Sequence, residues 1–96
     1  MHKKDPNPVR AVAATYLAHD PDPATSKALV EATDDKNWIV RAAALEAIAQ
    51  RGDVSLLPKI VPKFTDKSPK VRYTAAAAVI RLSGLEQRKI AHNIAK

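Results

Sequence analysis

The chain contains no cysteine, only two glycines and few aromatic side chains. One Trp, two Tyr and one Phe make up 4% of its 96 residues. Without cysteine, disulfide bonds and thiolate metal sites are excluded, although the cell compartment stays open. Two isolated glycines cannot form a phosphate-binding loop, which needs several of them at close spacing. The core must therefore be built from Ala, Val, Ile and Leu.

Long apolar runs are also missing. No stretch reaches the ~18 apolar residues that a membrane-spanning helix needs. The opening segment MHKKDPNPV has two lysines but no apolar stretch, so we expect neither a signal peptide nor a membrane partner. The alternation of apolar and polar residues that marks half-buried strands is absent too. Ala and charged residues dominate, and both favour helices, so we expect a soluble all-α protein. The sequence does not indicate its cell compartment.

One short motif recurs at a fixed interval. The dipeptide Val-Arg returns every 31 residues and each time opens an alanine-rich stretch. Its three copies are Val9-Arg10, Val40-Arg41 and Val71-Arg72. Self-similarity at a period of about 20 to 50 residues is typical of repeat proteins, in which each unit stacks on its neighbours.

Aligned on Val-Arg, the chain divides into three units within a single domain, approximately residues 5–35, 36–66 and 67–96. Each unit is expected to hold two helices, A and B. The A helices should begin near Pro8, Trp38 and Pro69, and the B helices should span roughly 23–34, 55–65 and 85–95. The A helices carry apolar residues at helical spacing, as Val9, Ala13, Tyr16 and Leu17; Val40, Ala44, Ala47 and Ile48; and Val71, Ala75, Ala78 and Val79. The apolar faces of the B helices are Leu29 with Val30; Leu56, Leu57, Ile60, Val61 and Phe64; and Ile90, Ala91 and Ile94.

Glycine and proline mark where the helices should end or bend. The proline-containing run at 19–23 ends the first A helix, because proline cannot continue a helix. Gly52 and Gly84 lie where the second and third A helices should end, and glycine suits a left-handed C-cap. Pro62 lies inside the second B helix and should bend it or weaken one turn.

The pattern D-x-x-x-x-V-R-x-x-A-A-x-A resembles a HEAT-type repeat, and its short form is similar to the repeats of phycobilisome lyases. The second unit carries it as Asp35, Val40, Arg41, Ala44, Leu45 and Ile48, and the third as Asp66, Val71, Arg72, Ala75, Ala76 and Val79. The first unit keeps Val9, Arg10, Ala13 and Ala14 but has Lys4 in place of the aspartate. The resemblance implies an α-solenoid of three HEAT-like helical hairpins, with about six helices in a right-handed superhelical stack.

The resemblance also implies a ladder of aspartate and arginine between successive repeats. Its members here would be Asp35, Asp66, Arg10, Arg41 and Arg72. A carboxylate before a helix can accept backbone N–H groups, and the planar fork of arginine can pair with such a carboxylate. We therefore interpret these arginines as structural, with a row of phosphate-binding arginines as the alternative.

Convergent reactive groups are scarce. His2, His19 and His92 have no partner at metal-ligand spacing, and no His-Glu motif of the HEAT-like iron hydroxylases occurs. The aspartates near 20–22 and 34–35 are too few and too scattered for a calcium loop. We therefore expect no enzyme activity, no metal site and no cofactor.

Positive charge is concentrated toward the C-terminus. The net charge is +6, and residues 66–96 hold seven Lys/Arg against two Asp/Glu. On the expected B helices the charged residues form one face: Lys27 and Glu31, then Lys59 and Lys63, then Arg88, Lys89 and His92. This face is either a solvated surface or a surface for a partner. Trp38, the single tryptophan, either covers a turn or anchors a partner.

These observations predict a non-catalytic protein–protein interaction or scaffold module with a partner of unknown identity. One hypothesis is that the chain is a fragment of a longer array. The alternative is nucleic-acid or polyanion binding through the basic B-helix face, which would weaken steeply with salt. An accessory subunit of a bilin lyase is a third hypothesis that rests on family analogy. Val12 and Tyr16 lie near an uncovered end, so self-association through the first unit is also expected.

Overall fold

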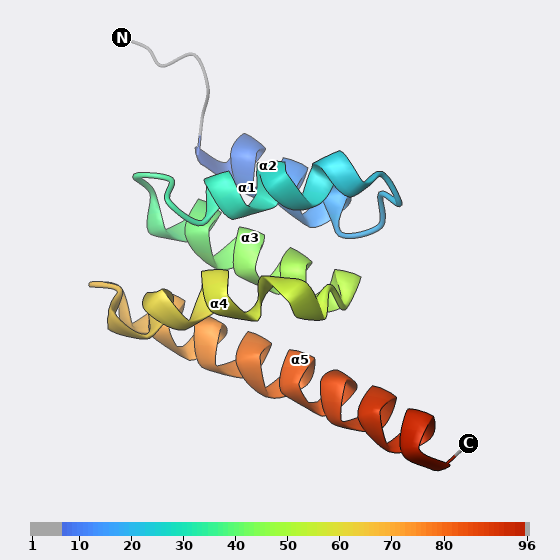
Figure 1. The fold of residues 1–96 in the computed structure, drawn as a ribbon. Coiled ribbons are helices and arrows are strands. Elements are labelled where there is room, and N and C mark those ends of the chain that lie inside the picture. Colours follow the sequence, from blue (N-terminus) through green and yellow to red (C-terminus); the bar gives the residue numbers. More distant parts are fainter. Residues whose placement is uncertain (1–6, 96) are drawn as a thin grey trace, which may run out of the picture.

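The computed structural model describes residues 7–95, and it is helical throughout apart from short turns (Figure 1). The α-helices are α1 (Asn7–Leu17), α2 (Pro23–Ala32), α3 (Trp38–Arg51), α4 (Leu57–Ile60) and α5 (Pro69–Ala95). Two 3₁₀ segments, η1 (Val54–Leu56) and η2 (Val61–Thr65), flank α4. The prediction of an all-α, solenoid-like fold built from helical hairpins is confirmed.

The A helices α1, α3 and α5 stack in one layer, with α3 in contact with both of the others (Figure 1). The second layer holds α2, which packs on α3, and the η1–α4–η2 segment, which packs on α5. Local capping explains the helix starts. The side chains of Asp22 and Asn37 each accept a backbone N–H of the helix that follows, both at 2.9 Å. Each A helix begins within one residue of its predicted start.

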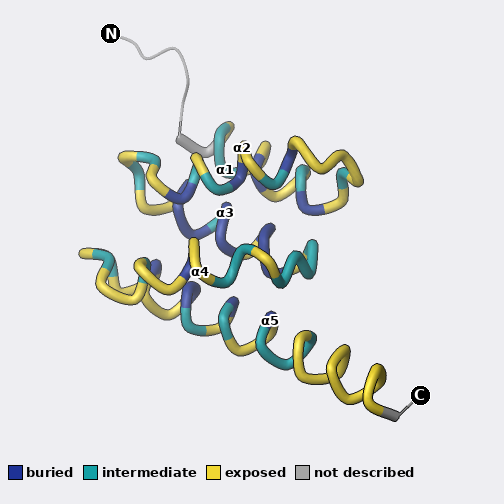
Figure 2. The backbone as a smooth tube through the Cα atoms, viewed as in Figure 1, coloured by how far each residue is buried: buried dark blue, intermediate teal, exposed yellow. Residues whose placement is uncertain are grey.

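The core is aliphatic and is centred on α3 (Figure 2). The predicted apolar stripe of the second unit is buried, as are Val71, Ala75 and Ala78 of the third. Small alanine side chains at these contacts let the helix backbones approach closely. The stripe predicted for the first unit is wrong, because Val9 and Tyr16 are exposed while Ala14 and Ala18 are buried. Only one side of α1 is covered by a neighbouring A helix, and that side carries the alanines.

The second B element is irregular, as Pro62 predicts. The α-helical turn of α4 gives way to 3₁₀ geometry at Val61, immediately before this proline. Proline cannot donate the N–H that an α-helix would need there. Of the predicted apolar face, Ile60 is fully buried, whereas Val61 and Phe64 are 46% and 42% exposed.

The third unit differs from the expected hairpin. Helix α5 runs for 27 residues through Gly84, so the third B helix is a continuation of the third A helix. Within residues 7–95 only Gly52 adopts a positive φ, 72°, and it forms the predicted left-handed C-cap of α3. One helical glycine costs only about 1 kcal/mol, and the residues after Gly84 are mostly good helix formers without proline.

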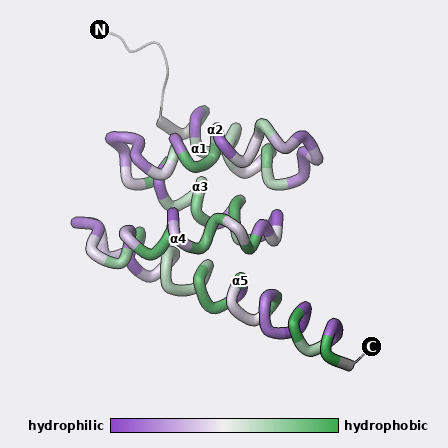
Figure 3. Tube along the Cα trace, viewed as in Figure 1, coloured by the Kyte–Doolittle hydropathy of each residue, from purple (hydrophilic) through white to green (hydrophobic). Residues whose placement is uncertain are grey.

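The consequence is a projecting helix end. Residues 86–94 are all exposed (Figure 2). Hydrophobic residues nevertheless continue to that end, alternating with hydrophilic ones (Figure 3). Within residues 7–95, none of the helices has the length and apolar character needed to cross a membrane.

The two glycines should respond to alanine with opposite signs. A Cβ at Gly84 would meet only the Arg88 side chain, at 3.7 Å, so Gly84→Ala should raise the free energy of unfolding by about 0.5–1 kcal/mol. A Cβ at Gly52 would strain the left-handed backbone and lie 3.3 Å from Leu85 Cδ1, so Gly52→Ala should lower it by about 1–2 kcal/mol. Urea denaturation measures both. If Gly84→Ala is as destabilising as Gly52→Ala, Gly84 ends a helix in solution and the third hairpin does form.

Candidate interaction surface

Arginine–aspartate pairs join the successive units. Arg10 on α1 donates two hydrogen bonds to the Asp35 carboxylate before α3, Nε to Oδ2 at 3.0 Å and Nη2 to Oδ1 at 3.1 Å. Arg41 on α3 donates in the same way to Asp66 before α5, at 2.8 and 2.9 Å. Each carboxylate also accepts the backbone N–H two residues further on, at 2.9 Å. Two parallel charge-assisted bonds restrict the geometry of the pair strongly. These contacts therefore orient each turn relative to the A helix of the preceding unit.

The two pairs differ in depth. The side chains of Arg41 and Asp66 are only 7% and 9% exposed, and the Arg10–Asp35 pair is less buried. Hydrogen bonds from Arg10 hold the pKa of Asp35 below its usual value. Burial raises the pKa of Asp66, but the hydrogen bonds and charge of Arg41 outweigh burial, and the pKa of Asp66 is lowered. Both aspartates are therefore ionised at neutral pH.

Arg72 occupies the equivalent place on α5. Its Nη1 donates to the Asp66 carbonyl oxygen at 2.7 Å, as Arg41 Nη1 does to the Asp35 carbonyl at 2.9 Å. Arg72 is exposed, and no carboxylate within the described part of the chain forms a salt bridge with it.

Two further arginines bind the opposite ends of the A helices. Arg51, at the end of α3, donates to the carbonyl oxygens of Leu17 and Asp22, both at 3.2 Å, and to that of Asp20 between them. Arg81 Nε on α5 donates to the Ala49 carbonyl at 2.8 Å. The carbonyl groups of Leu17 and Ala49 also accept a backbone N–H, so the arginines add a second donor at the C-terminal ends of α1 and α3 and tie each end to the next A helix. Sequence reasoning missed these residues, since their spacing does not follow the repeat; their only signal is arginine near the end of an A helix.

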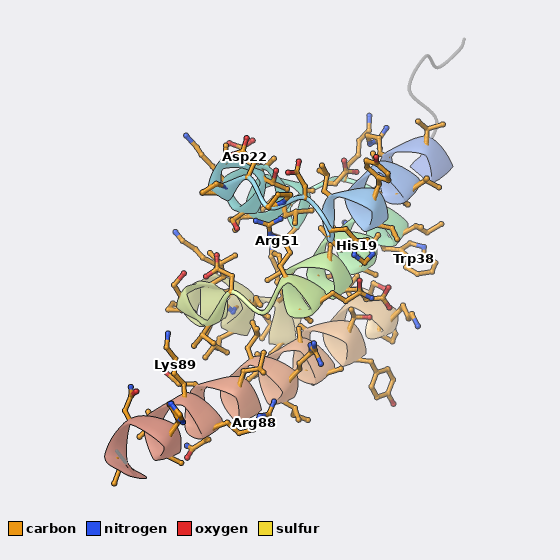
Figure 4. The ribbon with its side chains drawn as sticks, turned by 90° about the vertical axis from the view of Figure 1, so that its right-hand side faces the viewer. His19, Asp22, Trp38, Arg51, Arg88 and Lys89 are labelled. Atoms are coloured by element: carbon orange, nitrogen blue, oxygen red, sulfur yellow. The ribbon has the colours of Figure 1, made fainter. Side chains whose placement is uncertain are left out.

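The charged face expected along three B helices is divided. Its exposed members are Lys27 and Glu31 on α2, Lys59 on α4, and Arg88, Lys89 and His92 on α5. The last three were expected beside α4 but lie on the projecting end of α5, because residues 85–95 form no third B helix. Figure 4 shows Arg88 and Lys89 there, away from Trp38. Lys63 is partly buried and forms a salt bridge with Asp34, which neutralises its charge.

Trp38 is the first residue of α3 and borders an open hollow between the turns that precede α3 and α5. Figure 4 shows its side chain at the edge of the molecule. The hollow has a volume of about 580 Å³ and is lined by Lys36, Trp38, Arg41, Lys67, Ser68, Pro69 and Lys70. The indole is 44% exposed. We call this the Trp38 hollow.

A second hollow continues from Lys70 between α3 and α5. Its volume is about 530 Å³, and it is lined by Glu46, Ala49, Gln50, Lys70, Tyr73, Thr74, Ala77, Ala78 and Arg81. We call it the α3–α5 groove. Lys70 borders both, so the groove and the Trp38 hollow are neighbours. Sequence reasoning named Trp38 but missed the lysines, although Lys36 and Lys67 follow the repeated aspartates directly and are 31 residues apart.

The described residues around the groove and the Trp38 hollow include no metal-binding cluster. Among residues 7–95, no three His, Cys, Asp or Glu side chains lie close enough together to hold a metal ion. His19 and His92 are exposed on different parts of the chain, and His2 and Lys4 lie outside the described residues. The surface carries the ammonium groups of three lysines and the aromatic side chains of Trp38 and Tyr73.

Comparison with known families agrees with the repeat and the fold. The family model for HEAT repeats matches residues 1–81. Among curated proteins, no significant match is found. HEAT repeats generally mediate protein–protein interaction and scaffolding, and they are generally non-catalytic. The match spans most of the sequence, and the chain belongs to the HEAT-repeat family.

Proposed function

We propose that this chain is a non-catalytic protein-interaction module that holds its partner in the α3–α5 groove and the adjoining Trp38 hollow. One observation carries the proposal: all four aromatic side chains of the sequence are exposed, and none lies in the core. They are Tyr16, Trp38, Phe64 and Tyr73. A small protein that leaves its largest apolar side chains in solvent has surface available for a partner.

The groove is the best supported part of that surface. Tyr73 is 76% exposed on its wall, and Trp38 borders the neighbouring hollow, which shares Lys70 with the groove. Tyr and Trp are enriched among the residues that dominate binding energy at protein interfaces. Ile80, largely exposed further along α5, extends the apolar area.

Polyanion binding through the basic B-helix face is the second candidate. Lys27 and Lys59 are exposed, which supports it. The salt bridge of Lys63 with Asp34 and the position of Lys89 on the projecting end both weaken it, because they leave no continuous row of free cations. The observations therefore favour a protein partner.

Tyr73→Ser tests the groove, with Tyr16→Ser as its matched control. The two tyrosines are 76% and 78% exposed, so neither change should alter folding measurably. The partner would be identified by affinity capture from cells that produce the protein, and its Kd measured by titration. We expect Tyr73→Ser to weaken binding by at least tenfold, the loss typical of an interface aromatic, and Tyr16→Ser to leave it unchanged.

Two outcomes would contradict this proposal. If Tyr16→Ser weakens binding and Tyr73→Ser does not, the first unit is the binding surface. Val12 and Tyr16 are exposed there, and captured material that is a second copy of the chain would support self-association through that unit. If the wild-type protein retains no partner, the module does not act by protein binding.

A further inference from the structure

We infer that the Trp38 hollow binds an acidic segment of the partner protein. The carboxylates of that segment pair with Lys36, Lys67 and Lys70, and an apolar side chain next to them packs on the Trp38 indole. The inference rests on the proposed function and names the chemistry of the partner at the same surface.

The lysines that line the hollow carry positive charge that no salt bridge within the described residues neutralises. Lys36, Lys67 and Lys70 are exposed, and within residues 7–95 no carboxylate forms a salt bridge with them. Among the neighbouring acids, Asp35 accepts two hydrogen bonds from Arg10 and Asp66 accepts two from Arg41. Asp34 forms a salt bridge with Lys63. Arg41 also lines the hollow, but Asp66 balances its charge. Three lysine charges remain, and they attract a ligand of opposite sign.

The lysines also sit on turns whose backbone is held in place. Lys36 and Lys67 directly follow Asp35 and Asp66, whose carboxylates are bound by arginine and by a backbone N–H of the same turn. The two lysines therefore project from fixed, equivalent points on successive units. Such preorganisation lowers the entropy cost of binding.

The apolar part of the hollow favours a ligand that has an apolar group next to its negative charge. More than half of the Trp38 side chain is covered by the protein, so its position is held, and Pro69 adds a second rigid apolar surface. The open hollow has a volume of about 580 Å³, which accommodates a few side chains of a partner. A short acidic segment with an apolar residue fits this combination.

The same features argue against nucleic acid. Proteins that bind single strands offer a row of aromatic side chains for successive bases, whereas this hollow has one. Beyond Lys70 the α3–α5 groove contains one acid, Glu46, and one base, Arg81, so it offers no row of positive charges for a phosphate backbone. A polypeptide with both acidic and neutral residues can follow that groove.

The fluorescence of Trp38, the single tryptophan, provides a direct test. The probe is a short synthetic peptide of glutamate and leucine, and its control has glutamine in place of glutamate. We expect a saturable change with the acidic peptide at physiological salt and none with the control. Lys36→Glu combined with Lys67→Glu should weaken binding by at least tenfold. Lys27→Glu combined with Lys59→Glu alters the net charge equally on exposed sites of α2 and α4, and it should leave the Kd within about twofold.

Each contrary result identifies what failed. Equal weakening by both double variants, or equal binding of the glutamine peptide, would overturn the inference. Short DNA that binds more tightly than the acidic peptide and depends on Lys36 and Lys67 would reassign the hollow to nucleic acid. If the captured partner depends on Tyr73 but binds the Lys36/Lys67 variant as well as wild type, the inference is wrong while the proposed function stands.

Discussion

Replacing Asp66 by asparagine should lower the free energy of unfolding by about 3 kcal/mol. The change would leave the Arg41 guanidinium, only 7% exposed, without the carboxylate that accepts its Nε and Nη2 hydrogens. A buried charge without a partner costs far more than the pair contributes, because water cannot replace the lost carboxylate. Urea denaturation followed by circular dichroism at neutral pH measures the effect.

Asp34→Asn is the matched control. Asp34 also forms a salt bridge, with Lys63, but its side chain is 74% exposed, so its removal should cost less than about 1 kcal/mol. An equally large loss in both variants would show that the Arg41–Asp66 pair has no special role in stacking the units.

Acid should destabilise the wild type more than Asp66→Asn. The pKa values of Asp35 and Asp66 are both lowered on folding. The stability that they contribute is therefore present above the ordinary carboxyl pKa of 3.8 and is lost as the pH falls through their lower folded-state values. The variant lacks one of these groups, so its unfolding free energy should depend less on pH below 3.8. Parallel pH profiles would contradict the lowered pKa of Asp66.

Ile48→Ala should cost about 3–4 kcal/mol, the largest core effect that we expect. Ile48 is fully buried on α3, in the cluster that joins α1 and α5 to this central helix. Truncation would open a cavity that the stacked helices cannot close without separating. A chain of this size has a total stability of only about 5–10 kcal/mol, so the loss should appear as a marked fall in the urea midpoint.

Ile39→Ala provides the comparison on the same helix. This isoleucine is 40% exposed, so its truncation should cost about 1 kcal/mol or less. Similar losses of unfolding free energy at both positions would mean that the face of α3 that carries Ile48 is packed no more tightly than the exposed position of Ile39.

Features that depend on a few neighbouring residues were predictable from the sequence. The period of 31 residues predicted the starts of α3 and α5, and the HEAT pattern predicted the all-α fold. Gly52 was correctly predicted as a left-handed cap, and Pro62 as the site of a weakened turn. Glycine and proline act through their own φ preferences and N–H groups, so their effects can be read without knowing the neighbours in space.

Features that depend on which surfaces meet could not be predicted. Gly84 resembles Gly52 in sequence position, yet α5 continues through it because helix formers follow and nothing at 84 requires a positive φ. The apolar stripe of α1 was misplaced because α1 is covered on one side only. The Trp38 hollow joins residues from two turns that are 31 residues apart in the chain, and only the stacking of α3 against α5 brings Lys36, Trp38 and Lys70 around one space. Local preferences thus account for where the helices begin, and long-range packing accounts for the surface that they form together.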